Sequence, residues 1–557
     1  MHYFGSRGAQ QAMRAEIQGY LDRGLFQPVH YSDIPDENRP YILPSLTGYK
    51  DRVGQPTGKA RVFVDGSRQL PELVGDAYSP VARPESTMFQ LGIAAKRGWM
   101  VASCDVKQAF TLAARPAGRD LYRYVRLSKD IVAVVISLAP HMSEFVCADG
   151  SMLVLMVYML YGYVEAGQQW FDHQMGIYLD FGFTMNLADP CVIHYSSPSG
   201  TVVGSVTVDD TLFCYSSPEV FAEVETMYRN AFGVDGYTTE KGLEFMHLGM
   251  KLVQNPEDKS IAVSQWAFVE ELVVQAAPMM EKFGAKRGLT PSDPDIFDGK
   301  EDSVALDERD RDIYRSLNMS VMFAATRTYP ECLVAASALA SRFVKATEDD
   351  MRRLLKTIQY MAGDPQHCLT IRPASEIIVC SADCSYAIHP DGYSQDGVAL
   401  GFQGDGDVPD SFFVFRSGKQ TTIAKSSCHG ELTSANIGAD YIVWARQLLE
   451  GFGVYHSPST LERHGLPDPD SESLQASTLR QDNQSTIHLI VRGRGSFRNS
   501  KHIRVREHFV RDLVRDGEIV VVWQHTSLMV ADLMTKGATR AVFFTLLPSL
   551  IGRRCGE

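Results

Sequence analysis

The chain lacks the features by which several protein classes are recognised. Its ten cysteines include no Cys-x-x-Cys pair and no Cys/His cluster at zinc-ligand spacing, which argues against a zinc site and a disulfide framework. Residues 1–7 have no apolar stretch like that of a signal peptide. The longest apolar run, residues 152–160, is too short to span a bilayer. We therefore expect a reduced, intracellular protein that does not enter a membrane.

An excess of positive charge is also missing. The 557 residues include 54 Lys and Arg against 67 Asp and Glu, a formal net charge of −13. A nucleic-acid-binding protein with this balance needs a local basic groove, because its net charge repels phosphates. The length favours roughly two to four domains. Residues 284–312 and 457–477, rich in Pro and acidic residues, are predicted to be linkers.

The chain does contain three aspartates placed where they can share metal ions. Asp105 ends an apolar run, and Asp209 and Asp210 interrupt another run that predicts two strands joined by a tight turn. Neighbouring ionised carboxylates repel, so their place at the tip of an apolar hairpin calls for bound cations. Carboxylates around two divalent ions are what nucleotidyl transfer requires. The alternative is a solvated Asp-Asp turn without a ligand.

Four more acids lie in the last third of the chain. From residue 376 the pattern predicts the order strand, strand, strand, helix, strand, helix. Each acid lies beside a predicted strand end or helix start, so the four can converge on one site: Asp383, Glu431, Asp482 and Asp532. For any one of them alone, a solvated surface position is the alternative.

Several short motifs lie along the chain: Asp-Val-Lys-Gln-Ala-Phe (105–110), Leu-Tyr-Gly (160–162), Val-Asp-Asp (208–210), His-Leu-Gly (247–249), Ser-Pro-Val-Ala-Arg (79–83), Ala-Asp-Pro (188–190), Tyr-Arg-Ser (314–316), Ala-Thr-Arg-Thr-Tyr-Pro (325–330) and Asp-Asn-Gln-Ser (482–485). In order and spacing, these motifs resemble those of a copia-type retrotransposon reverse transcriptase, and the last four acids resemble those of a ribonuclease H domain. Together they extend over nearly the entire chain.

The resemblance implies an α+β fold. A right-hand polymerase would be followed by an α/β ribonuclease H-like domain with a mixed sheet. The implied domains are fingers and palm at 1–255, a thumb at 256–345, a helical connection at 346–373 and the ribonuclease H-like domain at 374–552. Implied activities are RNA- and DNA-directed DNA synthesis and hydrolysis of the RNA strand in RNA/DNA hybrids.

The resemblance also implies metal ligands and partners. Asp105, Asp209 and Asp210 would hold two Mg²⁺ ions, or Mn²⁺ in their place, and the four later acids would hold two more. Expected partners are an RNA template, a DNA primer, RNA/DNA hybrids and deoxynucleoside triphosphates, with no membrane. The expected location is intracellular, either the cytoplasm within a virus-like particle or the nucleus.

Other residues receive roles from the same resemblance. Arg61 would grip the incoming triphosphate, and Phe110 would exclude a ribose 2′-hydroxyl, although Phe110 alone would be read as core. Gly162 would let the backbone approach the nascent base pair. The predicted primer grip, for which a plain strand-turn-strand is the alternative, comprises His247, Leu248 and Gly249.

A basic run lies beside the last acids. Residues 492–511 hold seven Lys or Arg and one acid. Such a run is usually a solvated face, but its position favours a surface that follows the phosphates of the hybrid. Its predicted contacts are Arg498, Lys501 and Arg504.

The chain departs from the family pattern at several positions. Thr207 stands where the family usually has tyrosine, and Val164 and Glu165 stand where it prefers lysine and glutamine. Glu165 is thus expected to add negative charge near the template. These differences keep open a second interpretation, a catalytically decayed or domesticated nucleic-acid-binding remnant of the same fold. An unrelated phosphotransferase with an Asp-Asp hairpin would leave the second half unexplained.

Overall fold

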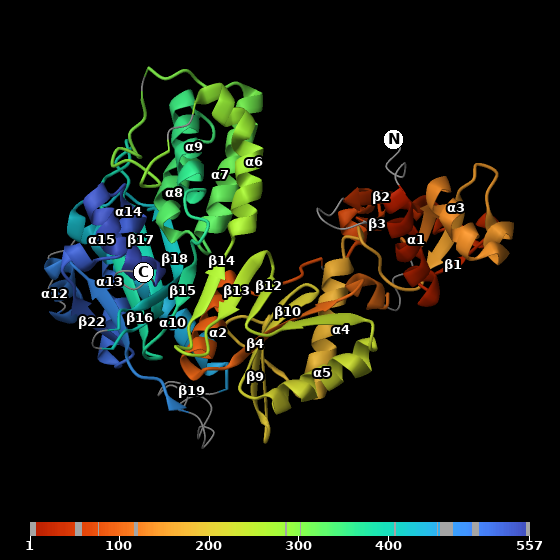
Figure 1. Ribbon diagram of the computed structural model, residues 1–557, viewed down its shortest axis with the longest axis horizontal. Helices are drawn as coiled ribbons and strands as arrows, with labels where there is room; N and C mark the ends of the chain where they lie inside the picture. The colour runs from red at the N-terminus through yellow and green to blue at the C-terminus, as the bar shows by residue number, and fades with distance from the viewer. Residues whose placement is uncertain are drawn as a thin grey trace.

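The computed structural model is a mixed α/β structure whose N-terminal lobe stands apart from the rest of the molecule (Figure 1). The structure describes residues 7–50, 58–75, 77–115, 121–284, 287–300, 302–405, 408–453, 455–456, 472–492 and 501–552. Among these, no helix combines the length and the apolar composition that crossing a membrane requires. Buried apolar side chains form three clusters, one of which joins elements from both halves of the chain.

The N-terminal lobe is built on a sheet in the order β1-β6-β5-β2-β3. Its strands are β1 (Phe26–Pro28), β2 (Leu43–Lys50), β3 (Lys59–Val64), β5 (Tyr124–Leu127) and β6 (Met152–Met156). Helix α1 (Arg7–Asp22) packs on β3, and α3 (Lys129–Leu138) packs on α1. The lobe therefore has its own buried cluster, separate from the other two.

A second sheet, in the order β11-β4-β10-β9-β8-β7, forms the centre of the molecule (Figure 1). Its strands are β4 (Met100–Val106), β7 (Thr184–Met185), β8 (Val192–Ser197), β9 (Gly200–Thr207), β10 (Asp210–Tyr215) and β11 (Tyr237–Lys241). Side chains alternate along β10, so Phe213 packs with α4 (Ala166–Phe181) and α5 (Pro218–Phe232), whereas Leu212 faces α2 (Pro84–Arg97). The sheet is thus covered on both faces.

Helix α2 has clear boundary signals in the sequence. Pro84 occupies the first helical turn, where its missing N–H costs nothing, and Gly98 ends the helix in the left-handed conformation with φ of 69°. Local sequence signals therefore account for both ends of α2.

A third sheet is followed in the chain by a group of four helices, after which the last strand of the sheet completes it. The sheet has the order β12-β13-β14-β15, with β12 (Glu244–His247), β13 (Met250–Gln254), β14 (Ile261–Ser264) and β15 (Leu369–Ile371). The helices are α6 (Trp266–Phe283), α7 (Glu308–Ala325), α8 (Leu333–Ala340) and α9 (Glu348–Met361). Because β14 pairs with β15, the chain returns to this sheet after the helices.

The last third forms a mixed sheet in the order β18-β17-β16-β21-β22. Strands β16 (Ile378–Ser385), β17 (Gln395–Phe402) and β18 (Ser411–Lys419) are antiparallel, and β21 (Ser477–Gln481) and β22 (Ile519–Trp523) run parallel to β16. The helices are α10 (Ser427–Glu450), α12 (Gln484–Arg492), α13 (Lys501–Arg515), α14 (Asp532–Thr535) and α15 (Arg540–Ile551), and the short β19 (Tyr455–His456) and β20 (Glu472–Ser473) pair separately. The six predicted elements occur in the predicted order, as β16, β17, β18, α10, β21 and α12, and the short β19 and β20 lie between α10 and β21.

Helix α2 joins this last sheet to the central one. The Phe89 ring, fully buried, lies 5.5 Å from Phe402, 5.0 Å from Phe413 and 5.9 Å from Trp444, measured between ring centroids. Gly92 lies so close that a Cβ there would come within 2.8 Å of the Phe402 ring. A helix from the first half thus belongs to the core of the second half.

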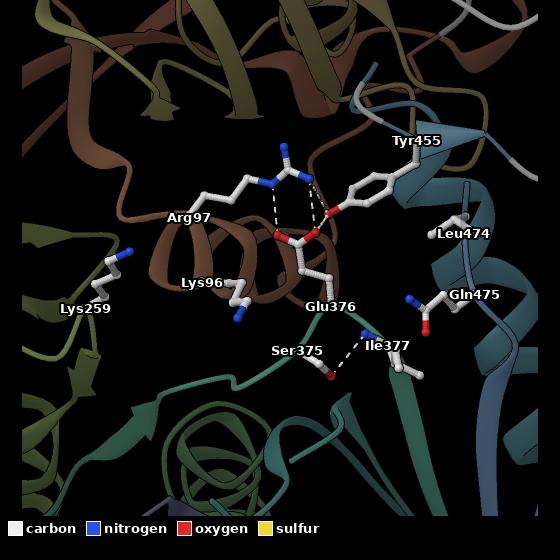
Figure 2. A pocket seen from close by; sticks show the side chains of 9 residues that line it. All are labelled: Lys96, Arg97, Lys259, Ser375, Glu376, Ile377, Tyr455, Leu474 and Gln475. Carbon is white, nitrogen blue, oxygen red and sulfur yellow. Dashed lines mark hydrogen bonds and ion pairs between the residues drawn. The ribbon is translucent and has the colours of Figure 1, made fainter. Parts of the chain in front are cut away.

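A cavity of about 500 Å³ lies at the end of this junction (Figure 2). Arg97, at the end of α2, donates two hydrogen bonds of 2.9 and 3.0 Å to the Glu376 carboxylate, and Tyr455 donates a third to it. The Lys96 ammonium donates to the Ala374 carbonyl. These polar contacts fix the start of the last domain against α2.

Candidate metal centres

The first centre consists of Asp105, Asp209 and Asp210. Asp210 begins β10 and pairs directly with Asp105 on the antiparallel β4, so both carboxylates lie at the same edge of the central sheet. One oxygen from each of the three lies within 4.8 Å of the others, and all three side chains are half-buried. The structure thus brings together the three acids that the sequence singled out.

The turn that carries Asp209 is held from two sides. Thr207 pairs with Asp210, which leaves Val208 and Asp209 as the two turn residues, and Val208 has a φ of 58°. A β-branched residue rarely adopts this left-handed conformation. The Trp170 indole donates a 2.8 Å hydrogen bond to the Val208 carbonyl, and the Val106 amide donates to that of Asp209 at 3.1 Å. These bonds stabilise the strained turn.

Two acids of the first centre, Asp105 and Asp210, have raised pKa values. Burial, followed by the charges of Asp105 and Asp209, raises the pKa of Asp210 to about 7. Burial and then Asp209 also raise the pKa of Asp105, against the opposing effect of Lys59. A bound cation would relieve this repulsion, and a purely carboxylate donor set suits hard ions such as Mg²⁺ or Mn²⁺. The residues present therefore fit the predicted metal.

Three aromatic and basic side chains form a wall beside this centre. The Arg61 guanidinium lies over the Tyr161 ring, 4.4 Å from its centroid, and the Phe110 ring meets Tyr161 edge-on at 5.1 Å. Burial raises the pKa of Tyr161 to about 12, and Asp209 and Asp105 contribute to the shift. Tyr161 was not assigned a role from the sequence. Its signal was its position inside the Leu-Tyr-Gly motif.

The packing of the chain against itself requires a glycine at position 162. Its φ is 95°, and a Cβ there would lie 2.1 Å from the Val64 carbonyl oxygen at the end of β3. A Cβ on Gly66 would in turn lie 1.9 Å from the Gly162 carbonyl oxygen. Only glycine permits this double approach. The predicted contact with a nascent base pair stays a prediction.

The predicted primer grip is a tight turn. His247 ends β12 and pairs with Met250, so Leu248 and Gly249, with φ of 47° and 76°, form the turn. The buried His247 ring shares a 2.8 Å hydrogen bond with the Ser103 hydroxyl on β4, and burial lowers its pKa to about 4. The turn is thus anchored to the strand that carries Asp105, while its contact with a primer stays a prediction.

Glu165 does not present its charge to solvent, contrary to the sequence expectation. Its side chain is buried and accepts a 2.9 Å hydrogen bond from Gln69, and its other oxygen lies 3.8 Å from the Arg115 guanidinium. The neighbouring Val164 is exposed. The Arg115 guanidinium, which is distant in sequence, therefore compensates the negative charge of Glu165, and Gln69 satisfies its other oxygen.

The second centre consists of Asp383 on β16, Glu431 on α10 and Asp482 after β21. One oxygen from each lies within 4.8 Å of the others. Burial, and then Asp383 and Asp482, raise the pKa of Glu431 to about 10. Its buried Oε2 has no hydrogen-bond partner in the part of the chain that the structure describes. An orphaned carboxylate oxygen facing two acids fits a cation site.

Asp532, the fourth predicted acid, lies outside this group of three. It begins α14 and is buried, and its carboxylate oxygen Oδ1 accepts a 2.8 Å hydrogen bond from the Lys536 ammonium. The sequence predicted that all four acids share one metal site. Within the described residues, the structure groups three of them.

The last residue of β22 and the segment after it add contacts that the sequence did not single out. The Thr526 hydroxyl donates a 2.7 Å hydrogen bond to Oδ2 of Asp482, and the Trp523 indole donates to the Asp482 carbonyl at 3.1 Å. The one sequence signal was a short polar stretch between a strand and the helix of Asp532.

The basic run is described only in part. Arg498 and the side chains of Lys501 and Arg504 lie outside the described residues. Farther along α13, Arg506 donates a 2.9 Å hydrogen bond to Thr433 on α10. At least one cation of the run therefore serves to attach α13 to the helix that carries Glu431.

Comparisons with known proteins agree with the resemblance. The chain is 23% identical over 488 residues (87% of its length) to the retrovirus-related Pol polyprotein from transposon RE1 of Arabidopsis thaliana. It is 24% identical over 505 residues (89%) to that from transposon TNT 1-94 of Nicotiana tabacum. These curated homologues are Pol polyproteins of copia-type plant transposons. The chain spans about a third of their length, 30% and 34% respectively.

The fold also has a relative among solved structures, although no family model matches the chain. A foamy viral protease-reverse transcriptase in complex with double-stranded DNA superposes with a TM-score of 0.50 at 11% identity. The match covers 94% of this chain and 70% of the viral chain. At this identity the likeness concerns the fold alone.

Proposed function

We propose that this chain is an RNA- and DNA-directed DNA polymerase that also hydrolyses the RNA strand of RNA/DNA hybrids. The observation that carries the proposal is the pairing of Asp105 with Asp210, which with Asp209 brings three carboxylates within 4.8 Å of one another. Similarity to transposon Pol polyproteins over 87% and 89% of the chain supports nucleotidyl transfer among the reactions such a centre can perform.

In this proposal the domains follow the boundaries expected from the sequence. Residues 1–255 are fingers and palm, 256–345 the thumb, 346–373 the connection and 374–552 the ribonuclease H-like domain. The helices α6, α7 and α8 then make up the thumb, α9 the connection and the mixed sheet the nuclease. The order of the elements supports this division.

At the first centre the chain's own residues hold and orient the reactants. Asp105, Asp209 and Asp210 would bind Mg²⁺ or Mn²⁺, which stabilises phosphate charge and activates the primer hydroxyl. Arg61 would hold the triphosphate through its fork of donors, kept in place by the Tyr161 ring. Phe110, packed against the same ring, would close the space next to the sugar.

At the second centre Asp383, Glu431 and Asp482 would bind the metal. Thr526 fixes one oxygen of Asp482, so the remaining lone pairs point in a defined direction. The expected substrate is the RNA strand of a hybrid, and the nucleic acid bound by the foamy viral relative supports a duplex partner in general terms.

One experiment on two variants tests both centres. Wild-type protein should extend a DNA primer on an RNA template and should cleave the RNA of a hybrid, each with Mg²⁺. Asp209→Asn should lower extension by about two orders of magnitude or more and leave cleavage intact, because it removes one ligand at the first centre alone. Asp482→Asn should do the reverse.

The matched control is Asp180→Asn, an exposed acid on α4. It should change neither activity. Equal extension by Asp209→Asn and wild type would refute the polymerase assignment. Loss of both activities in Asp482→Asn would refute two separate centres. A wild-type protein that binds a hybrid yet performs neither reaction would favour the decayed remnant.

A further inference from the structure

The segment that follows Asp105 contains a residue with a strained backbone. Gln108 adopts the left-handed conformation, with φ of 54° and ψ of 40°, and it directly precedes the short 3₁₀ helix η5 (Ala109–Leu112), which contains Phe110. A residue with a Cβ rarely adopts this conformation unless its surroundings hold it there. The strain at Gln108 therefore calls for contacts that fix the residue.

Helix α1, in the N-terminal lobe, provides the first of these contacts (Figure 1). The Gln108 side-chain amide donates a 2.9 Å hydrogen bond to the Glu16 carboxylate, whose other oxygen accepts a 2.6 Å hydrogen bond from the Tyr20 hydroxyl. Gly19 permits the close approach, because a Cβ there would come within 2.8 Å of Oε1 of Gln108. The Gln108 side chain thus lies against α1 and is held by a carboxylate that Tyr20 orients.

A second contact from α1 reaches the other side of Phe110. The amide and the hydroxyl of the buried Thr111 donate hydrogen bonds of 2.9 and 2.6 Å to the Gln108 carbonyl. The same hydroxyl accepts a 2.7 Å hydrogen bond from the Arg23 guanidinium. Glu16 and Arg23 are seven residues apart, which places them on one face of α1. This face therefore contacts the chain just before and just after Phe110.

Phe110 lies where two buried clusters meet. Its ring packs against the cluster of the N-terminal lobe and against the cluster between the central sheet and helices α4 and α5. Helix α1 also packs on β3, the strand that carries Arg61. One helix thus contacts both the strand of Arg61 and the segment of Phe110, the two side chains expected to face the nucleotide.

We propose that Glu16 and Arg23 are positioning residues for nucleotide selection at the first centre. Through Gln108 and Thr111 they fix the segment that places Phe110 next to the sugar of the incoming nucleotide. The N-terminal helix then contributes to the choice of sugar without touching the nucleotide. The inference rests on the proposed polymerase function and extends it to two residues of α1.

The test compares deoxyribonucleotides with ribonucleotides in primer extension by the full chain. Glu16→Ala and, separately, Arg23→Gln should lower the ratio of kcat/KM for deoxyribonucleotides to that for ribonucleotides by about tenfold, because Phe110 is then free to shift. Glu16→Gln, which keeps an acceptor for Gln108, should retain most of the ratio. Cleavage of the RNA strand in a hybrid should keep its wild-type rate in all three variants.

A double variant tests whether the effect passes through Phe110. In a Phe110→Ala background, adding Glu16→Ala should cause no further loss of the ratio, since the ring that Glu16 positions is gone. The matched control is Gln18→Ala, which removes an exposed side chain of α1 that donates a hydrogen bond to Asp22 on the same helix. This control should leave the ratio unchanged.

An unchanged ratio in both Glu16→Ala and Arg23→Gln, even with a lowered melting temperature, would overturn the positioning role and leave the polymerase assignment in place. A wild-type ratio in Phe110→Ala, or a further loss when Glu16→Ala is added to it, would also overturn the role, because the effect would not pass through Phe110. A wild-type protein that does not extend a primer would overturn the proposed polymerase function and this inference with it.

Discussion

At the scale of single residues, two roles for Phe110 can be separated by experiment: packing in the core and exclusion of a ribose 2′-hydroxyl. It packs on Tyr161, as a core residue would, yet it follows Asp105 by five positions and lies beside the first centre. If it excludes the 2′-hydroxyl, Phe110→Ala should raise incorporation of ribonucleotides relative to deoxyribonucleotides by about tenfold or more. Primer extension with each nucleotide class measures this ratio.

Phe63 offers the control for that variant. Its ring also meets Tyr161, at 6.3 Å, but it belongs to β3. Phe63→Ala should change stability without changing sugar preference. If Phe110→Ala loses both nucleotide classes equally, or only melts earlier, Phe110 is a packing residue.

Asp210 links the first centre to pH. Its pKa of about 7 in the folded protein lies above the usual value, so the folded state holds the proton more tightly than the unfolded state. This stabilising effect is complete below the usual pKa and is lost as the pH rises towards about 7. Mg²⁺ binds the ionised form, so stabilisation by Mg²⁺ should increase over the same window.

We therefore expect Mg²⁺ to raise the melting temperature more at about pH 8 than at about pH 6. The measurement uses the Asp482→Asn variant, with EDTA as the metal-free reference, so that the first centre dominates. A Mg²⁺ effect of the same size at both pH values would contradict the role of Asp210.

At the scale of elements, α2 is a helix that packs against both the central sheet and the last sheet. Phe89→Ala removes a ring that is fully buried against aromatic side chains of the last sheet. We expect it to cost about 3–5 kcal/mol of unfolding free energy and to lower the melting temperature. Phe544→Ala on α15, where the ring is 46% exposed, should cost clearly less. Equal losses would mean that α2 is not central to the junction.

Elements could be predicted where the signal was local. The apolar runs on either side of Asp209 and Asp210 predicted the β9–β10 hairpin, and Pro84 and Gly98 mark the ends of α2. Side-chain partners distant in sequence left no such signal. Neither the Arg115 and Gln69 partners of Glu165 nor the place of α2 in the last domain's core follows from a period or a motif.

The predicted linker at 284–312 shows the same limit. Ile296 and Phe297 are buried, and Asp295 pairs with Arg353 on α9 at 3.0 Å. Its Pro- and Asp-rich composition resembles that of a linker, but apolar side chains within it are buried in the core. The second predicted linker, 457–477, lies mostly outside the described residues.

At the scale of the whole molecule, the buried clusters do not follow one another along the chain as separate domains would. The N-terminal lobe has a buried cluster of its own, whereas the largest cluster reaches from Met88 in α2 to Ile551 in α15. Under mechanical tension applied at the two ends, the N-terminal lobe can therefore yield alone. Separating α2 from the central sheet would also break its packing contacts with the last domain. A force trace would then record one small early rupture and one large late one, rather than one event for each domain read along the sequence.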